Sequence, residues 1–331
     1  MLRPTRRFVL IGLGSLLVLA AAGALYQDVS VQREARRFPP PGRLVDVGGH
    51  RLHLVCLGEG EPTVVFESSA FGSSLSAEAA RMEVSAETRV CSYDRMGTGW
   101  SDPSSGRISV GMLADDLKVL LDRAGLAAPY VLVPASIGGL TVEMFARRYP
   151  DRVAGLVFVD AANSASQILH RASGLNWMHI EAACLGRLAA RLGLLRLFDP
   201  FDLRQDPSDA AARSAALLYR TERMATLCDF VRGVPTSLQE LKDAPPLAPD
   251  VPLVVLIAET SEGRLPPGFG SLGEASAADS RESQKRFAQR STRGTWRIVP
   301  NSGHLIAASQ PHAVASAVLE MLALFRRAER R

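Results

Sequence analysis

The chain has 331 residues, 47% of them hydrophobic, and a formal net charge of +4. This length allows one or two domains, and the apolar content is enough for a large core. Arginine supplies most of the positive charge, because the only lysines are Lys118, Lys242 and Lys285. No run of alternating basic and aromatic residues accompanies this charge, so a nucleic-acid partner is not expected.

The N-terminus has the composition of a membrane-targeting segment. Arg3, Arg6 and Arg7 precede an uncharged stretch from Phe8 to Tyr26. As a helix, this stretch would span about 28 Å, close to the hydrocarbon thickness of a bilayer. The arginine cluster predicts that the N-terminus stays in the cytoplasm and that the remainder is exported. The predicted segments are a basic cytoplasmic stub over 1–7, a membrane anchor over 8–26 and a linker over 27–42.

A cleavable signal peptide is the alternative interpretation of the same segment. The run from Ala20 to Ala24 offers the small residues that a signal peptidase needs. In either case the main domain lies outside the cytoplasm. It is periplasmic or on the cell surface if the segment is an anchor, and secreted if the segment is removed.

The rest of the chain alternates between strand and helix signals. Short apolar runs predict buried strands, and apolar residues three or four apart predict amphipathic helices. In chain order, the predicted elements are a hairpin over 43–57 that turns at Gly48 and Gly49, strands over 63–66 and 89–93, a helix over 109–124, a strand over 130–133, a helix over 137–148, a strand over 155–159, a strand over 251–258, a helix over 280–290, a strand over 295–299 and a helix over 311–328. No strand is predicted between 162 and about 250. Such alternation indicates an α/β fold.

Two short segments carry the residues suited to chemistry. In Val131–Gly139, a predicted strand runs into a helix through Ser136, and Asn301–His304 is a tight turn that ends in a histidine. A serine hydroxyl is a poor nucleophile until a base takes its proton, and histidine is well suited to that task at neutral pH. A serine on a sharp strand-to-helix turn, with a histidine late in the chain, is the nucleophile-elbow arrangement.

These segments resemble the α/β-hydrolase superfamily, in its branch of serine esterases, lipases and peptidases. The stretch Tyr93–Asp102 is similar to the family's D-x-R-G-x-G-x-S loop, and Phe145–Asp151 follows the elbow as expected. The likeness runs from about Pro39 to Phe325. Two residues depart from the family's G-x-S-x-G elbow, since Pro134 replaces the first glycine and Ala135 stands where a histidine is common.

The resemblance implies a mostly parallel eight-stranded sheet flanked by helices, with an inserted helical cap. The core would comprise residues 43–161 and 251–331, and the cap residues 162–250. Within the cap, Leu185, Leu188, Leu192 and Leu195 lie opposite Arg187 and Arg191 on a predicted helix. These leucines are suited either to packing the cap on the core or to lying on a membrane surface.

The resemblance also implies a catalytic triad. Ser136 would be the nucleophile and His304 the general base. Glu262 follows the strand over 251–258, where the family usually places its acid, and is the first choice for it. Asp160, at the end of the strand over 155–159, is the alternative, and Glu259 is a further one.

The oxyanion hole would come from two backbone N–H groups. One belongs to Ile137, at the start of the helix after the elbow. By alignment with the family's H-G-x turn, the other belongs to Ala70, with Ser69 as the next choice.

The four cysteines agree with export. In the strand order of the family, the strands that hold Cys56 and Cys91 are neighbours, so a disulfide between them is expected. Cys184 and Cys228 both fall in the predicted cap and could pair there, although four cysteines allow three connectivities. Free buried thiols are the alternative interpretation of all four.

No metal or cofactor is expected from the sequence. His50 and His53 are three residues apart on a predicted strand, so they point to opposite faces. No H-E-x-x-H motif or clustered Cys/His spacing indicates zinc.

The reaction that suits these residues is hydrolysis of a carboxylic ester through an acyl-serine intermediate. The expected partners are a small-molecule or lipid-like ester substrate and the membrane. Two other functions remain open: a non-catalytic binding protein with this fold, which the altered elbow would suit, and an aminopeptidase-like hydrolase.

Overall fold

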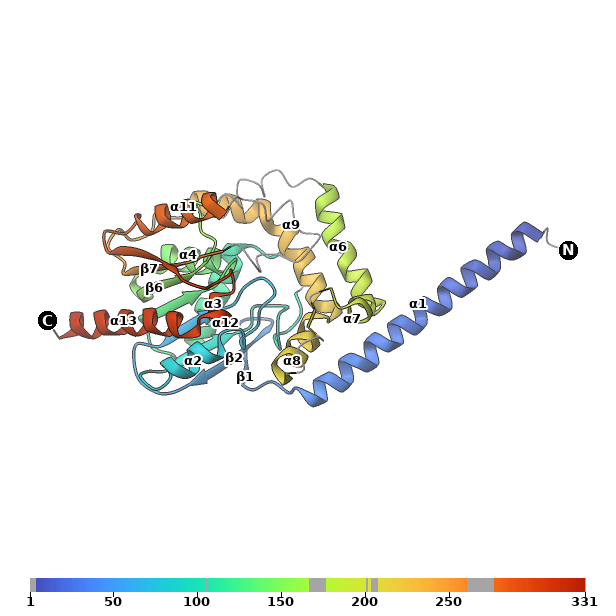
Figure 1. Cartoon of the computed structure of the whole chain (residues 1–331), viewed down its shortest axis with the longest axis horizontal. Helices are drawn as coiled ribbons and strands as arrows, with labels where there is room; N and C mark the ends of the chain where they lie inside the picture. Colours follow the sequence, from blue (N-terminus) through green and yellow to red (C-terminus); the bar gives the residue numbers. More distant parts are fainter. Residues whose placement is uncertain are drawn as a thin grey trace.

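The structure is a computed structural model that describes residues 4–104, 106–166, 177–200, 202–203, 208–260 and 277–330. Its centre is one eight-stranded sheet in the order β1-β2-β4-β3-β5-β6-β7-β8 (Figure 1). The strands are β1 (Arg43–Asp46), β2 (Arg51–Leu57), β3 (Val64–Glu67), β4 (Val90–Tyr93), β5 (Tyr130–Pro134), β6 (Val153–Val159), β7 (Leu253–Ala258) and β8 (Gly294–Val299). All neighbours from β4 to β8 are parallel, whereas β2 runs antiparallel to β1 and to β4.

The burial of the strands follows from their place in the sheet. Every residue of β3, β4, β5 and β7 is buried, as expected for parallel strands that are covered on both faces. The predicted hairpin over 43–57 is confirmed as β1 and β2. Its turn is closed by a hydrogen bond from the Val47 N–H to the His50 carbonyl (2.9 Å), and both Gly48 and Gly49 have a positive φ.

Helices cover both faces of the sheet. The helices of the core are α2 (Glu78–Val84), α3 (Val110–Arg123), α4 (Gly138–Arg148), η1 (Pro150–Arg152), α11 (Ala277–Ala288), α12 (Ile306–Ser309) and α13 (Pro311–Glu329). Buried side chains of α3, α4 and α11 pack together on one face, and those of α2 and α13 pack on the other. The helix predicted over 109–124 is confirmed as α3. Ser109 caps its N-terminus, because the serine side chain accepts a hydrogen bond from the Met112 N–H.

A group of helices follows β6 and precedes β7, in the part of the chain predicted to form a cap. These cap helices are α6 (Trp177–Arg191), α7 (Leu194–Phe198), α8 (Asp209–Leu218) and α9 (Thr221–Asp243). No strand occurs among the described residues of this region, as predicted. In Figure 1 the cap helices lie on the opposite side of the core from the C-terminus.

Both expected disulfides are present. Cys56 and Cys91 are opposite each other in the register of β2 and β4, with their Cα atoms 4.0 Å apart. Cys184 and Cys228 join α6 to α9, with their Cα atoms 4.8 Å apart. The first bond therefore locks the antiparallel strand β2 to β4, and the second holds two cap helices together.

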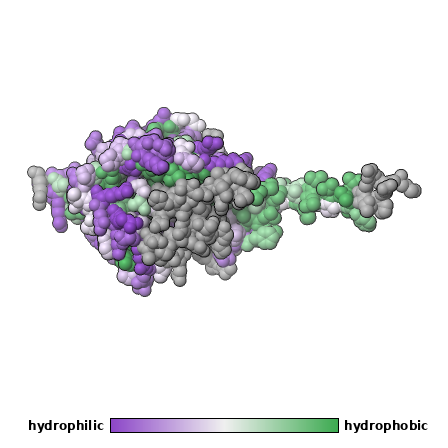
Figure 2. Space-filling view, turned by 90° about the horizontal axis from the view of Figure 1, so that it is seen from above, coloured by the Kyte–Doolittle hydropathy of each residue, from purple (hydrophilic) through white to green (hydrophobic). Residues whose placement is uncertain are grey.

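The N-terminal segment forms one continuous helix, α1 (Pro4–Arg37), so most of the predicted linker is helical. Over the described residues, α1 is the one helix long and apolar enough to cross a membrane. Its first part projects away from the body and carries apolar side chains on its surface (Figures 1 and 2). Its second part contacts the cap, where the side-chain amide of Gln27 donates to the carbonyl of Tyr219 (2.8 Å).

Candidate active site

The turn between β5 and α4 has the strained geometry of a nucleophile elbow. Ser136 has a φ of 52°, a left-handed conformation that non-glycine residues rarely adopt. Its carbonyl accepts hydrogen bonds from the N–H groups of Ala162 (2.8 Å) and Gly139 (3.0 Å), which hold the turn in place. α4 begins with two glycines, because its first turn passes close to the loops after β3 and β6. A Cβ on Gly138 would lie 2.7 Å from the Ser68 carbonyl oxygen, and a Cβ on Gly139 would lie 2.1 Å from the Ala162 carbonyl oxygen.

Pro134, the departure from the family's elbow, is accommodated at the end of β5. The N–H groups of Val131 and Ala135 donate to the carbonyls of Thr63 and Glu67, both at 3.0 Å. Successive N–H groups of a strand point to opposite neighbours, so the backbone nitrogen of Pro134 faces β6. The ladder between β5 and β6 has its last pair at Leu132 and Leu156, apart from an isolated bridge between Ala135 and Val159. The N–H that proline lacks therefore falls where no regular ladder hydrogen bond is required.

The structure brings Ser136, His304 and Asp160 into one hydrogen-bonded chain. Ser136 Oγ lies 2.9 Å from His304 Nε2, and His304 Nδ1 lies 2.5 Å from Asp160 Oδ2. The three side chains come from the turn after β5, the loop after β8 and the end of β6. With Asp160 ionised, Nδ1 carries the ring hydrogen, and Nε2 is left as an acceptor for the serine proton.

Asp160 is buried, and its carboxylate is fixed by further donors. Its Oδ1 accepts from the side-chain amide of Gln284 (2.7 Å) and from the Ala258 N–H (3.3 Å). Gln284 is itself buried on α11. These contacts direct the other oxygen, Oδ2, at His304.

Of the three candidate acids, the structure describes Asp160 and Glu259. Glu262, the first choice, lies outside the described residues. Asp160, the alternative, makes the contact to His304 through Nδ1. Glu259 has another role, because its Oε2 accepts the N–H of Asn301 (2.8 Å) and so supports the turn that leads to His304.

Two arginines hold the loop after β3, which was expected to supply one oxyanion donor. Arg95 donates to the carbonyls of Ser68 (2.6 Å) and Ser69 (2.7 Å), and Arg223 of α9 donates to the carbonyl of Ala70. The peptide between Ser69 and Ala70 is trans, so its N–H points opposite to its C=O. Because Arg95 holds the Ser69 carbonyl, the Ala70 N–H is directed away from Arg95.

The charges behind this loop are buried. Arg95 forms an ion pair with Glu67, the last residue of β3, and burial raises the pKa of Glu67 while Arg95 opposes that rise. Burial also lowers the pKa of Arg223, and the nearby Arg95 adds to this effect. The loop is thus fixed from behind by guanidinium groups that water reaches only slightly.

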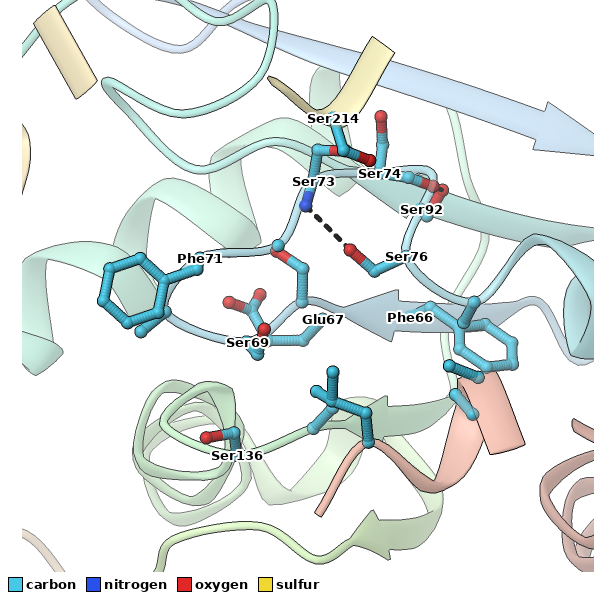
Figure 3. A pocket seen from close by; sticks show the side chains of 18 of the residues that line it. Phe66, Glu67, Ser69, Phe71, Ser73, Ser74, Ser76, Ser92, Ser136 and Ser214 are labelled. Atoms are coloured by element: carbon cyan, nitrogen blue, oxygen red, sulfur yellow. Dashed lines mark hydrogen bonds between the residues drawn. The ribbon is translucent and has the colours of Figure 1, made fainter. Parts of the chain in front are cut away.

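A cavity of about 530 Å³ opens above Ser136. Figure 3 shows Ser136 on one side of it and the loop from Glu67 to Ser76 on the other. The cap contributes Leu203, Leu217 and Leu218 to the walls, and Ala70 and His304 also line it. This volume lies within the range of about 300–1,000 Å³ that is typical of small-molecule sites.

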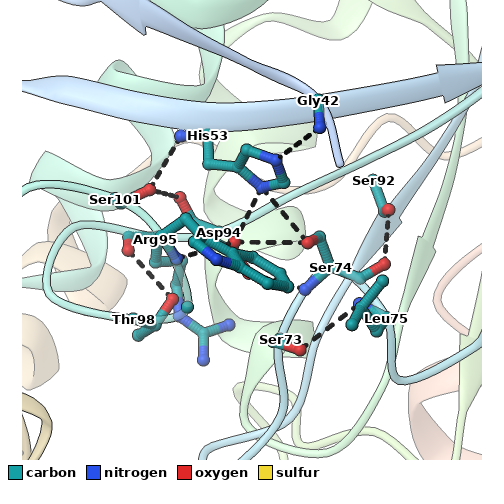
Figure 4. A network of polar contacts seen from close by, with 12 residues as sticks. Gly42, His53, Ser73, Ser74, Leu75, Ser92, Asp94, Arg95, Thr98 and Ser101 are labelled. Atoms are coloured by element: carbon teal, nitrogen blue, oxygen red, sulfur yellow. Dashed lines mark hydrogen bonds and ion pairs between the residues drawn. The ribbon is translucent and has the colours of Figure 1, made fainter. Parts of the chain in front are cut away.

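A second Ser–His–Asp group, shown in Figure 4, is structural. His53 Nδ1 lies 2.8 Å from Asp94 Oδ2, and the Ser74 hydroxyl is close to both. His53 Nε2, however, accepts the N–H of Gly42 (3.0 Å), and His53 has 0% exposure. With both ring nitrogens occupied and no access for substrate, this histidine cannot serve as a base. The network instead fixes the loop that leads to Arg95.

The two backbone donors predicted for the oxyanion hole are both described by the structure. The Ile137 N–H, the first expected oxyanion donor, lies at the N-terminus of α4, next to Ser136. Neither Ile137 nor Ala70 donates its N–H to another described residue. Over the described residues, no group of three His, Cys, Asp or Glu could hold a metal ion.

Three residues of the site were not identified from the sequence: Arg95, Arg223 and Gln284. Arg95 was visible in the quoted loop Tyr93–Asp102, where an arginine directly after an aspartate was a usable signal. Arg223 and Gln284 lie on helices far from Ser136 in the chain, and no local pattern marks them.

Comparisons with known proteins agree with this fold. A family profile described as the alpha/beta hydrolase fold matches residues 62–226. YbdG, an uncharacterized protein of Bacillus subtilis (strain 168), is 26% identical over 181 residues, 53% of this chain and 55% of that protein, so the chain spans about half of this relative's length.

Solved structures give the same result. A thermophilic esterase of Thermogutta terrifontis is similar with a TM-score of 0.64 and 22% identity, over 86% of this chain and 98% of that one. The enol-lactonase of Burkholderia xenovorans LB400 has a TM-score of 0.58 and 22% identity, over 85% and 100% of the two chains. From its sheet order, its elbow and these matches, the chain belongs to the α/β-hydrolase superfamily.

Proposed function

We propose that the chain is a serine hydrolase that cleaves carboxylic esters, with Ser136 as nucleophile, His304 as base and Asp160 as the acid. The observation that carries this proposal is the continuous contact from Ser136 Oγ through His304 to Asp160, at 2.9 and 2.5 Å. The strained φ of Ser136 supports it, because such strain is typical of functional turns.

Each step has a residue suited to it. As Ser136 Oγ attacks the ester carbonyl, His304 Nε2 takes the hydroxyl proton, and the buried carboxylate of Asp160 stabilises the imidazolium that forms. When the tetrahedral intermediate collapses, His304 returns that proton to the departing alcohol, leaving the acyl group on Ser136. A water molecule then attacks the acyl-enzyme with His304 again as base; the bond between the acyl carbon and Ser136 Oγ breaks, His304 returns the proton to Oγ, and the acid product leaves.

The charge on the intermediate's oxygen would be stabilised by the N–H groups of Ile137 and Ala70. Ile137 contributes a free amide at the positive end of the dipole of α4. For Ala70, we assign Arg95 the role of a positioning residue, because its hydrogen bond to the Ser69 carbonyl orients the peptide. Arg95 thus replaces the histidine and glycine that usually shape this loop in the family.

The walls of the cavity favour an ester over a peptide. On the cap side, Leu203, Leu217 and Leu218 line the cavity beside the polar Asp202, Ser214 and Arg223. None of the described carboxylates near Ser136 is without a partner: Glu67 pairs with Arg95, Asp160 contacts His304, and Asp202 is engaged as well. An aminopeptidase would need a carboxylate free to bind the substrate's amine. The esterase and the enol-lactonase among the similar folds also agree with an ester or lactone substrate.

We further propose that α1 anchors the protein in a membrane with the hydrolase domain outside the cytoplasm. Its apolar segment supports the anchor, and the arginines before it support this orientation. The two disulfides fit an oxidising compartment.

The test is hydrolysis of p-nitrophenyl esters, from acetate to palmitate, by the full chain in lipid nanodiscs. Turnover should be measurable and should fall to background in Ser136→Ala, while Ser309→Ala, a serine of the short helix α12, should retain it. Equal activity in all three proteins would refute the role of Ser136. Ligand binding without turnover in any of them would favour the non-catalytic binding protein.

A further inference from the structure

Large apolar side chains gather on the outer side of the cap. Leu185, Leu188, Leu194, Leu197 and Phe198 are all exposed, with Leu197 at 64% and Phe198 at 74%. We call these five residues of α6 and α7 the cap apolar surface. Single exposed leucines are ordinary, but a cluster of this size on two consecutive helices usually marks a binding surface.

The cap apolar surface begins where the apolar segment of α1 ends. Tyr26 is the last residue of that segment, and a Cβ on Gly193 would lie 2.8 Å from its ring. A Cβ on Gly23 would lie 2.4 Å from the carbonyl oxygen of Leu192. Glycines thus let α1 and the start of α7 meet at van der Waals distance. In Figure 2 the apolar colour of α1 continues where the helix meets the body.

This contact is locked by a buried polar group. Arg196 of α7 is 3% exposed, and it donates to the side-chain oxygen of Gln27 (2.7 Å) and forms an ion pair with Glu34. Since an uncompensated buried guanidinium would be costly, α7 is held to α1 in this one arrangement. The orientation of α1 therefore sets the orientation of the cap.

The depth of α7 follows from the length of the apolar segment. A helix over residues 8–26 spans about 28 Å, so Tyr26 lies at the headgroup level, where tyrosine is enriched. Gly193, which lies against Tyr26, directly precedes Leu194, the first residue of α7. Leu194, Leu197 and Phe198 therefore lie near the same headgroup level as Tyr26. The exposed guanidinium of Arg187, on the neighbouring α6, is suited to lipid phosphates.

The same part of the cap lines the active-site cavity. Pro200, Asp202 and Leu203 follow α7 directly and contribute to the cavity wall. The chain thus passes from the exposed Phe198 to the wall of the site within a few residues. We propose that the cap apolar surface rests in the bilayer that α1 crosses, and that the cavity takes its ester substrates from that bilayer. This inference rests on the proposed anchor and hydrolase activity.

The docking is tested independently of activity by fluorescence quenching. The full chain carrying Phe198→Trp is placed in nanodiscs with and without dibrominated phosphatidylcholine, and the signal of the wild-type chain is subtracted. Leu324→Trp, at an exposed site on α13 far from α1, is the matched control. For a side chain in the interface, the indole introduced at position 198 should be quenched by at least about twofold, while the one introduced at position 324 is unaffected. Equal and weak quenching of both would overturn the docking.

The source of the substrate is tested with the triple variant Leu185→Ser, Leu197→Ser, Phe198→Ser. Its activity on a long-chain ester dissolved in the nanodisc should fall about tenfold, while its activity on water-soluble p-nitrophenyl acetate stays within about twofold. An equal effect on both substrates would refute uptake from the bilayer. No hydrolysis of either ester by the wild-type chain would instead refute the hydrolase, and quenching would still decide the docking.

Discussion

Replacing Asp160 by asparagine isolates the role of the acid. The introduced amide is nearly the same size as the carboxylate, so the packing is kept, but its orientation is dictated by the existing donors. Gln284 and the Ala258 N–H both donate to Oδ1 and therefore require an oxygen there. The NH2 group must then face His304 Nδ1, which becomes an acceptor, and the ring hydrogen moves to Nε2, where the proton of Ser136 should be received.

Two losses add up in this variant. The imidazolium that forms during catalysis loses a carboxylate whose oxygen lies 2.5 Å from Nδ1. For charge centres about 4 Å apart and an effective dielectric constant of about 20, this attraction is about 4 kcal/mol, or roughly 10³-fold in rate. With the unfavourable tautomer added, we expect kcat to fall by roughly 10³ to 10⁴, as in other serine triads.

The assay is steady-state hydrolysis of p-nitrophenyl butyrate by the full chain in nanodiscs, with thermal unfolding as the check on folding. Glu262→Gln is the control, since Glu262 was the first choice from the sequence. We expect it to keep kcat within about twofold. A kcat that survives in Asp160→Asn but collapses in Glu262→Gln would refute the assignment of Asp160.

Three further predictions concern the loop after β3, the packing of the elbow and the loop from Tyr93 to Asp102. Arg95→Met should lower kcat by roughly 10- to 100-fold with little change in KM, because the Ala70 N–H is no longer oriented; an unchanged kcat in steady-state kinetics would contradict this role. Gly139→Ala should destabilise the fold by about 1–3 kcal/mol in urea unfolding, since its Cβ would meet the Ala162 carbonyl, whereas Gly186→Ala, with room in α6, should be neutral or stabilising. The hydrogen bonds from Arg51 lower the pKa of Asp102, so this carboxylate stabilises the native state above its unfolded pKa, and that contribution is lost as the pH falls through its folded pKa. Asp102→Asn should therefore be less stable than the wild type at pH 7, and the difference should shrink as the pH falls below about 4, the unfolded pKa of an aspartate. A difference that stays constant as the pH is lowered in urea unfolding would contradict the prediction.

Much of the fold was predictable because its signals are local. The alternating apolar runs predicted the hairpin over 43–57 and the central strands, and the strand-to-helix turn predicted the position of Ser136. The pairing of Cys56 with Cys91 followed from the strand order that the resemblance implied. In each case a short stretch of sequence, or the order of such stretches, determines the geometry.

The parts that no local pattern determines depend on distant contacts. Asp160 and Glu262 both suited the sequence pattern, and the contact of Asp160 with His304 depends on how the loops after β6 and β8 approach each other. Arg223 reaches the loop after β3 from a cap helix, a contact with no sequence signature. The residues after Tyr26 were predicted as a polar linker, helical or extended up to Arg37, and they form the second part of α1, which contacts such as Gln27 with Arg196 hold against the cap.

The most direct test of the central claim is to locate the covalent adduct of a fluorophosphonate. The full chain in nanodiscs is treated with the reagent, digested and mapped by mass spectrometry, beside His304→Gln. We predict a single adduct on Ser136 and labelling slowed by roughly 10³-fold or more in His304→Gln. No adduct, or an adduct on a loop serine such as Ser69 with Ser136 unmodified, would contradict the assignment of Ser136 as an activated nucleophile.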